Sequence, residues 1–86
     1  MSPDFPVPRF PRFPKNSELP GFPGTEPKGK INGRDTWADK KNWYQWDYQH
    51  GKVEKYRKSD GAHVGEFDPV TGEQTKGANP TRVFKP

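Results

Sequence analysis

Proline is distributed very unevenly along this chain of 86 residues, since eight of the eleven prolines lie in residues 1–27. Proline cannot donate a backbone hydrogen bond, and it pushes the residue before it toward an extended conformation. Helices and central strands are therefore disfavoured in the first third of the chain. We predict a Pro-rich linker or docking strip over residues 1–27 and one small domain over residues 28–86.

The stretch FPVPRFPRFP within the Pro-rich segment is typical of a stiff polyproline-type linker. A linker between domains is the simpler interpretation. The alternative is a docking strip that packs on the domain or on a partner through four aromatic side chains, Phe5, Phe10, Phe13 and Phe22.

Composition limits the kind of core that the remaining residues can form. Hydrophobic residues make up only 27% of the chain and aromatic residues 14%, so we expect a small core built from Trp, Tyr and Phe. Cysteine is absent, which excludes disulfides and thiolate metal sites. The chain shows no apolar run long enough to span a membrane and no signal peptide, and we expect no stable membrane association of this domain.

The net positive charge of the chain comes entirely from the predicted domain. Residues 1–27 carry three basic and three acidic side chains, whereas residues 28–86 carry twelve basic and eight acidic ones, which gives the net charge of +4. A basic domain of this kind indicates a polyanion or an acidic protein as partner.

Strand-forming residues and turn signals alternate through the rest of the chain. Aromatic and β-branched residues, separated by Gly, Pro, Asp and Asn, predict strands over residues 43–48, 52–58, 62–67, 73–76 and 81–84. Consecutive strands joined by tight turns form an antiparallel meander. Asp35–Lys41 is the one segment predicted as a short helix, with Asp35 as its cap. The predicted class is therefore mainly β (α+β).

Three side chains that can transfer protons, Asp47, His50 and Glu54, fall within eight residues of one another. Cleavage of RNA by its own 2′-hydroxyl needs a base, an acid and cations near the phosphate. Glu54 is a candidate base, His50 a candidate acid, and Asp47 a candidate to orient the imidazole. Whether Asp47 and Glu54 share one face depends on the strand register, which the sequence leaves open. The simpler interpretation is that all three are ordinary surface groups.

Cationic and aromatic side chains around this trio are candidates for contact with RNA. Basic residues can bind phosphates, and tyrosines can stack on bases. The candidates for substrate binding are Lys52, Lys55, Arg57, Lys76 and Tyr56.

The second histidine, His63, follows a turn, and we assign it a structural or surface role. A zinc site formed by both histidines and a carboxylate matches no established ligand spacing. We therefore expect neither a metal nor another cofactor.

The run YQWDYQHGKVEKYRKSDGAHVGEFDPVTG resembles the C-terminal cytotoxic domain of the colicins and cloacins that cleave ribosomal RNA. The segments WDYQHG, YRKSDG and FDPVTG occur in the family's order and at matching spacing, and the similarity continues through QTKGANPTR. The resemblance implies a strongly twisted antiparallel sheet with a short N-terminal helix. It also places Asp47, His50 and Glu54 on the family's catalytic residues, Arg82 on its essential arginine, and Lys76 on a lysine near the scissile phosphate.

The function that the resemblance implies is a metal-independent endoribonuclease that cuts small-subunit ribosomal RNA once, at the decoding site, and stops translation. It further implies a monomeric domain of a larger toxin that is secreted by one bacterium and acts in the cytoplasm of another. A small acidic immunity protein would be its second partner. Two alternatives remain: a toxin domain that cuts transfer RNA, and a non-catalytic basic module that binds RNA or protein.

Overall fold

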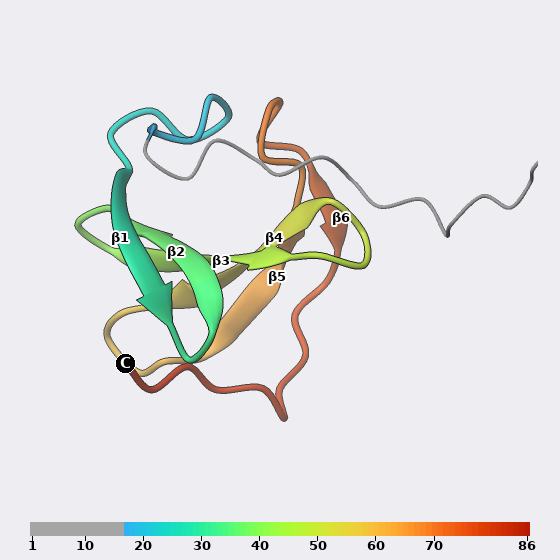
Figure 1. Cartoon of the computed structure of the whole chain (residues 1–86). Coiled ribbons are helices and arrows are strands. Elements are labelled where there is room, and N and C mark those ends of the chain that lie inside the picture. The colour runs from blue at the N-terminus through green and yellow to red at the C-terminus, as the bar shows by residue number, and fades with distance from the viewer. Residues whose placement is uncertain (1–16) are drawn as a thin grey trace, which may run out of the picture.

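The computed structural model describes residues 17–86, which form one antiparallel sheet of six strands in sequential order (Figure 1). The strands are β1 (Glu26–Ile31), β2 (Arg34–Ala38), β3 (Asn42–Asp47), β4 (Lys52–Arg57), β5 (His63–Phe67) and β6 (Gln74–Lys76). The predicted meander is confirmed for β3 to β6. No helix forms within the described residues, and so none there could span a membrane.

Two predicted elements are wrong. The segment Asp35–Lys41 is not a helix, because its first half is part of β2 and pairs with both β1 and β3. The Asp39 carboxylate instead accepts hydrogen bonds from the backbone of Lys41 and Asn42, which closes the turn before β3. Residues 81–84 form no strand and make only an isolated bridge between Val83 and Ala62.

The strand β1 was not predicted, because Pro27 and Gly29 lie inside it. Proline is tolerated in β1 because this strand lies at the edge of the sheet, where a missing backbone donor breaks no ladder. β1 also contains a register shift between Pro27 and Gly29, so the proline-rich end of the chain joins the sheet with an irregular pairing.

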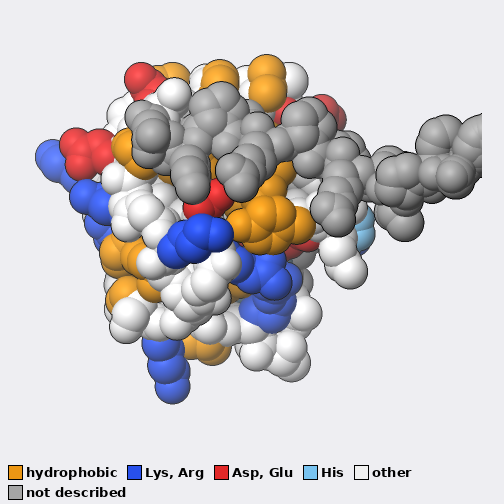
Figure 2. All heavy atoms as spheres, in the orientation of Figure 1, with side chains coloured by type: hydrophobic (Ala, Val, Ile, Leu, Met, Phe, Trp, Pro, Cys, Tyr) orange, Lys and Arg blue, Asp and Glu red, His pale blue; other side chains and the backbone are white. Residues whose placement is uncertain are grey.

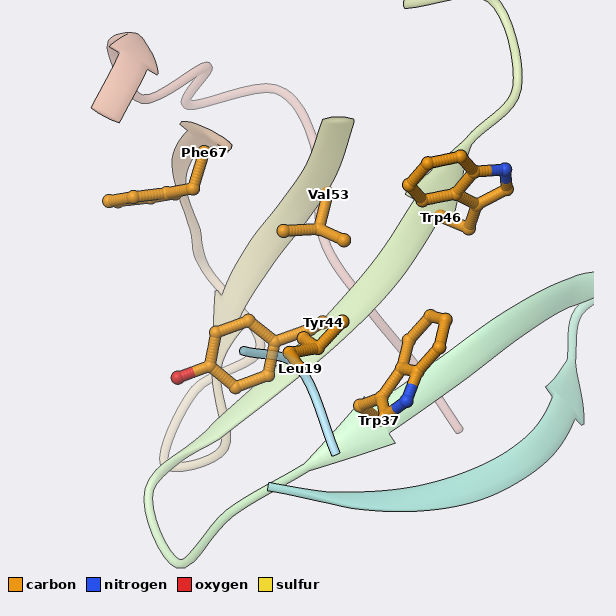
Figure 3. Close-up of a cluster of buried hydrophobic side chains, with 6 residues drawn as sticks. All are labelled: Leu19, Trp37, Tyr44, Trp46, Val53 and Phe67. Atoms are coloured by element: carbon orange, nitrogen blue, oxygen red, sulfur yellow. The ribbon is translucent and has the colours of Figure 1, made fainter. Parts of the chain in front are cut away.

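One face of the sheet carries the hydrophobic core. The pairs Trp37–Tyr44 and Trp46–Val53 lie directly opposite each other across neighbouring strands, and directly paired residues share a face. Figure 3 shows these four side chains together with one from β5 and one from the segment before β1, and the complete cluster is Leu19, Trp37, Tyr44, Trp46, Val53 and Phe67. The core is mainly aromatic, as the composition predicted.

Residues from the Pro-rich segment complete this core. Leu19 is fully buried, and the Trp37 indole donates a hydrogen bond of 2.7 Å to the Ser17 carbonyl. Phe22, one of the four phenylalanines of the docking-strip hypothesis, lies 4.7 Å from the Tyr44 ring centre. The other three, Phe5, Phe10 and Phe13, are outside the described residues, and the domain boundary at residue 28 stays a prediction.

The C-terminal residues return across the opposite face of the sheet, next to the β4–β5 turn (Figure 1). The Phe84 amide donates to the Gly61 carbonyl at 2.9 Å, and the buried Phe84 ring packs against Trp43 and Tyr56. This second, smaller apolar cluster anchors residues 77–86 and fixes where their polar side chains lie.

Candidate active site

Polar side chains gather on the face of the sheet that lies opposite the aromatic core. Glu54 in β4 pairs directly with Gln45 in β3 and with Glu66 in β5, and all three are buried. Asp47 pairs with Lys52 on the same face. The register that the sequence left open therefore places Asp47 and Glu54 on one face of the hairpin.

These side chains line a cleft of about 300 Å³ at the end of the sheet where β3 turns into β4. The walls come from β2 to β6 and from the C-terminal residues. The lining residues are Arg34, Asp47, Gln49, His50, Glu54, His63, Glu66, Lys76, Gly77, Asn79 and Arg82. The cleft thus contains five side chains that can take up or release a proton near neutral or mildly acidic pH, together with three cations.

Asp47 and His50 form a pair across the tight turn between β3 and β4. The His50 Nδ1 lies 2.7 Å from Asp47 Oδ2, and the other carboxylate oxygen accepts the Gln49 backbone amide at 2.9 Å. Partial burial acts to raise the pKa of Asp47, but the hydrogen bonds from His50 and Gln49 outweigh it and hold that pKa below 3.8. Asp47 is therefore ionised at neutral pH, and the half-exposed His50 ring lines the cleft and uses Nδ1 for its contact with Asp47.

Glu54 is held by His63 through a short, buried hydrogen bond. The His63 Nε2 lies 2.6 Å from Glu54 Oε1, and the Asn79 backbone amide donates to His63 Nδ1 at 2.8 Å. Since Nδ1 accepts a hydrogen bond, the neutral tautomer with the proton on Nε2 satisfies both contacts. Arg82 lies 3.5 Å from the same Oε1, and within residues 17–86 no hydrogen bond engages the other oxygen, Oε2.

Glu66 completes the acidic wall of the cleft. Its Oε2 accepts a hydrogen bond of 2.7 Å from Thr75, and its Oε1 lies 3.6 Å from His50 Nδ1. The ligand atoms of Asp47, His50 and Glu66 lie within 4.8 Å of one another, a spacing that a metal ion could occupy. In the structure, however, His50 Nδ1 already contacts both carboxylates.

A bulge in β5 brings both His63 and Glu66 to the cleft. His63 pairs with Tyr56 and Gly65 pairs with Lys55, which leaves Val64 as an extra residue on β5. In a regular strand, residues three apart point to opposite faces. The extra residue reverses this relation, so that both side chains face Glu54, and bulges of this kind are frequent beside active sites.

The predicted cations separate into two groups. Arg82 and Lys76 line the cleft, and the Arg82 guanidinium lies 5.9 Å from the ring centre of the buried Tyr56. The three others do not line it. Lys55 lies on the core face, with its ammonium 5.0 Å from the Phe67 ring centre; Lys52 is 3.6 Å from Asp68; and Arg57 pairs with Asp60 at 2.8 Å.

Four groups that line or support this cleft were not predicted as site residues. His63, predicted to be structural or at the surface, is buried and binds the candidate base, while Glu66 and Arg34 were not singled out. The Asn79 backbone amide was also not foreseen. The only sequence signal for His63 and Glu66 was that they lie in the strand after the β3–β4 hairpin. Regular alternation along that strand would place them on opposite faces, and the bulge at Val64 changes this.

Comparison with known proteins shows the family to which the chain belongs. A model of the family described as Cytotoxic matches residues 13–85. Colicin E3 from Escherichia coli is 47% identical over 68 residues, which is 77% of this chain, and cloacin from the same species is 51% identical over 67 residues, or 76%. Colicin-E6 is 48% identical over a similar stretch. The chain spans only 12% of the length of each of these relatives. The chain therefore belongs to the cytotoxic-domain family that includes segments of these colicins and of cloacin.

Proposed function

We propose that this domain is an endoribonuclease that cuts small-subunit ribosomal RNA at the decoding site and so blocks translation. The observation that carries the proposal is the pairing within one cleft of two acid–base units, Asp47 with His50 and Glu54 with His63, beside Arg82. Phosphodiester cleavage by an internal nucleophile requires two proton-transfer groups that are held separately, with a cation near them.

Glu54 acts as the base in this scheme. Its Oε1 is held by His63 and Arg82, which leaves Oε2 to take the proton from the ribose 2′-hydroxyl. The 2′-oxygen then forms a bond to phosphorus while the bond from phosphorus to the 5′-oxygen breaks. The products are a 2′,3′-cyclic phosphate and a free 5′-hydroxyl.

His50 acts as the acid that protonates the leaving 5′-oxygen from Nε2. The Asp47 carboxylate accepts a hydrogen bond from Nδ1, so it fixes the orientation of the ring and stabilises the imidazolium form before the proton is transferred. Arg82 and Lys76 neutralise the charge that develops on the phosphate oxygens. Each of these contributions typically changes the rate by roughly 10² to 10⁴.

The choice of ribosomal RNA as substrate is supported by the match to colicin E3 and cloacin rather than by the cleft, whose chemistry suits any RNA. On the same basis we propose that the domain is a monomeric part of a secreted toxin that acts in the cytoplasm of the target bacterium. A basic domain is also suited to bind a small acidic immunity protein.

The test is incubation of the domain with intact bacterial ribosomes, followed by analysis of the small-subunit RNA on a denaturing gel. We expect one discrete 3′ fragment, and its loss with His50→Ala and with Glu54→Gln. Tyr48→Phe, an exposed change in the same turn, is the matched control and should cut as the parent does. Cleavage that is equally fast with the His50 and Glu54 variants would overturn the assignment.

Two further outcomes distinguish the alternatives. Faster cleavage of purified transfer RNA than of ribosomes would favour a transfer-RNA-cleaving toxin domain. Salt-sensitive binding of RNA without any cleavage would favour a non-catalytic binding module.

A further inference from the structure

A second group of cations lies outside the cleft, at the end of the sheet away from the turn between β3 and β4. The turn before β3 and the turn after β4 together present four exposed basic side chains, here called the cationic patch: Lys40, Lys41, Arg57 and Lys58. They border a groove of about 490 Å³. Figure 2 shows Lys and Arg side chains at several places on the visible face of the molecule.

The two turns hold the cationic patch in a fixed arrangement. The Lys58 amide donates to the Lys41 carbonyl at 2.8 Å, which ties one turn to the other. Within the first turn the Asp39 carboxylate is fully engaged by the Tyr44 hydroxyl and by the amides of Lys41 and Asn42. A rigid backbone of this kind presents charges to a ligand at a low entropic cost.

Most of the positive charge in the cationic patch is not neutralised. Arg57 is paired with Asp60, and the Lys58 ammonium lies 4.8 Å from the Trp43 ring centre. Within residues 17–86, none of the three lysines Lys40, Lys41 and Lys58 makes a salt bridge with a carboxylate. Three lysine ammonium groups therefore remain available to an anionic partner.

We propose that the cationic patch is a second contact with the phosphates of the RNA substrate, separate from the cleft; this inference rests on the proposed ribonuclease function. Along β3 the patch begins where Asn42 pairs with Arg57, three residues from the position of Glu54 and five from Asp47. At about 3.3 Å per residue the patch therefore lies about 10 Å from the candidate base and about 17 Å from Asp47. The patch would thus bind RNA that lies outside the cleaved dinucleotide, and it would favour a large folded RNA over a short strand.

The composition of the cationic patch favours RNA over a protein partner. Protein interfaces are depleted in lysine and enriched in aromatic anchors. The large hydrophobic side chains that are exposed in the described part of the chain, Tyr48, Val70 and Val83, all lie outside the patch. Contacts with phosphates are commonly made by lysines and need no exposed aromatic anchor.

The experiment compares Lys40→Gln/Lys41→Gln/Lys58→Gln with a control of equal charge change, Lys28→Gln/Lys30→Gln/Lys85→Gln, on intact ribosomes. For the patch variant we expect kcat/KM to fall roughly tenfold or more at moderate salt, with kcat at saturating ribosomes kept. The slope of log kcat/KM against log salt should become shallower by about 2, since each single-strand phosphate contact contributes about 0.7. Replacement of the same three lysines by arginine should restore the parent slope.

Equal losses in the control variant, or an unchanged slope in the patch variant, would overturn the proposal. Ribosome binding, measured by co-sedimentation, distinguishes failure of the patch proposal from failure of the proposed ribonuclease function. If the parent cuts no RNA but binds ribosomes through the patch, only the proposed function fails. If the patch variant binds ribosomes as the parent does but loses an acidic protein partner, the surface is a protein interface and the inference is wrong.

Discussion

Substitution of His63 can separate its two hydrogen bonds, one to the candidate base Glu54 and one to the backbone of Asn79. The imidazole makes two contacts, donating to Glu54 from Nε2 and accepting the Asn79 amide at Nδ1. A glutamine can place its amide nitrogen near the position of Nε2, and an asparagine can place its oxygen near the position of Nδ1. His63→Gln therefore keeps the contact with Glu54, whereas His63→Asn keeps the contact with Asn79.

Both variants should be less stable than the parent by similar amounts. A hydrogen bond to a charged group is worth about 1.5–3 kcal/mol, and leaving the partly buried Asn79 amide without a partner costs at most about 1–3 kcal/mol. A domain of this size is stable by roughly 4–13 kcal/mol, so each single variant should still fold, with a lower midpoint in urea denaturation.

Activity should distinguish the two variants although stability does not. In His63→Gln the Glu54 carboxylate stays oriented, and we expect kcat on ribosomes within about tenfold of the parent. In His63→Asn the carboxylate can rotate away from the substrate, and misplacement of a reacting group by about 1 Å can cost about 10² in rate. Single-turnover cleavage under conditions where both variants are folded measures this difference. Equal activity of the two variants would refute the role of His63 in positioning Glu54.

Three other predictions concern the pKa of Asp47, the bulge in β5 and the role of metals. Because a hydrogen bond from His50 helps to hold the pKa of Asp47 below 3.8, His50→Ala should raise that pKa, which an NMR titration of the carboxyl group would detect; no change would mean that His50 is not its partner. The stability that Asp47 contributes is present above its unfolded pKa and should be lost as the pH falls through its folded pKa, which urea melts at pH 2 to 6 would follow. Gly65→Ala should destabilise the domain by about 1–3 kcal/mol in urea denaturation, because Gly65 has a φ of 150° and a Cβ there would overlap the Lys76 carbonyl. Gly77→Ala, where a Cβ meets nothing, is the control, and equal losses in both would exclude the bulge as the cause. Cleavage should survive EDTA; a loss that Zn²⁺ or Mg²⁺ restores would show that Asp47, His50 and Glu66 bind a metal, against the proton-transfer scheme.

Local sequence was sufficient to predict the meander from β3 to β6, because each of its turns is specified by residues within it. The Asp47 carboxylate and Gly51 close the β3–β4 turn, and Asp68 accepts the amides of Val70 and Thr71 in the turn after β5. The helix at Asp35–Lys41 was predicted wrongly because pairing with strands on both sides outweighed a local preference. β1 was missed for the same reason, since Pro27 is acceptable only at a sheet edge.

The sequence by itself determined the acid–base pair Asp47–His50, because one four-residue turn holds both groups and their contact needs no other part of the chain. The surroundings of Glu54 depended on the tertiary structure. The register placed Glu54 on the same face as Asp47, and one extra residue, Val64, turned both His63 and Glu66 toward it. The C-terminal segment brought Arg82 to Glu54, 28 residues away along the chain, and the Asn79 amide to His63, 16 residues away, because Phe84 is buried against Trp43 and Tyr56. A single inserted residue changes which face of the sheet each later side chain occupies, and long-range packing leaves no local signal in the sequence. These contacts could therefore be identified only from the tertiary structure.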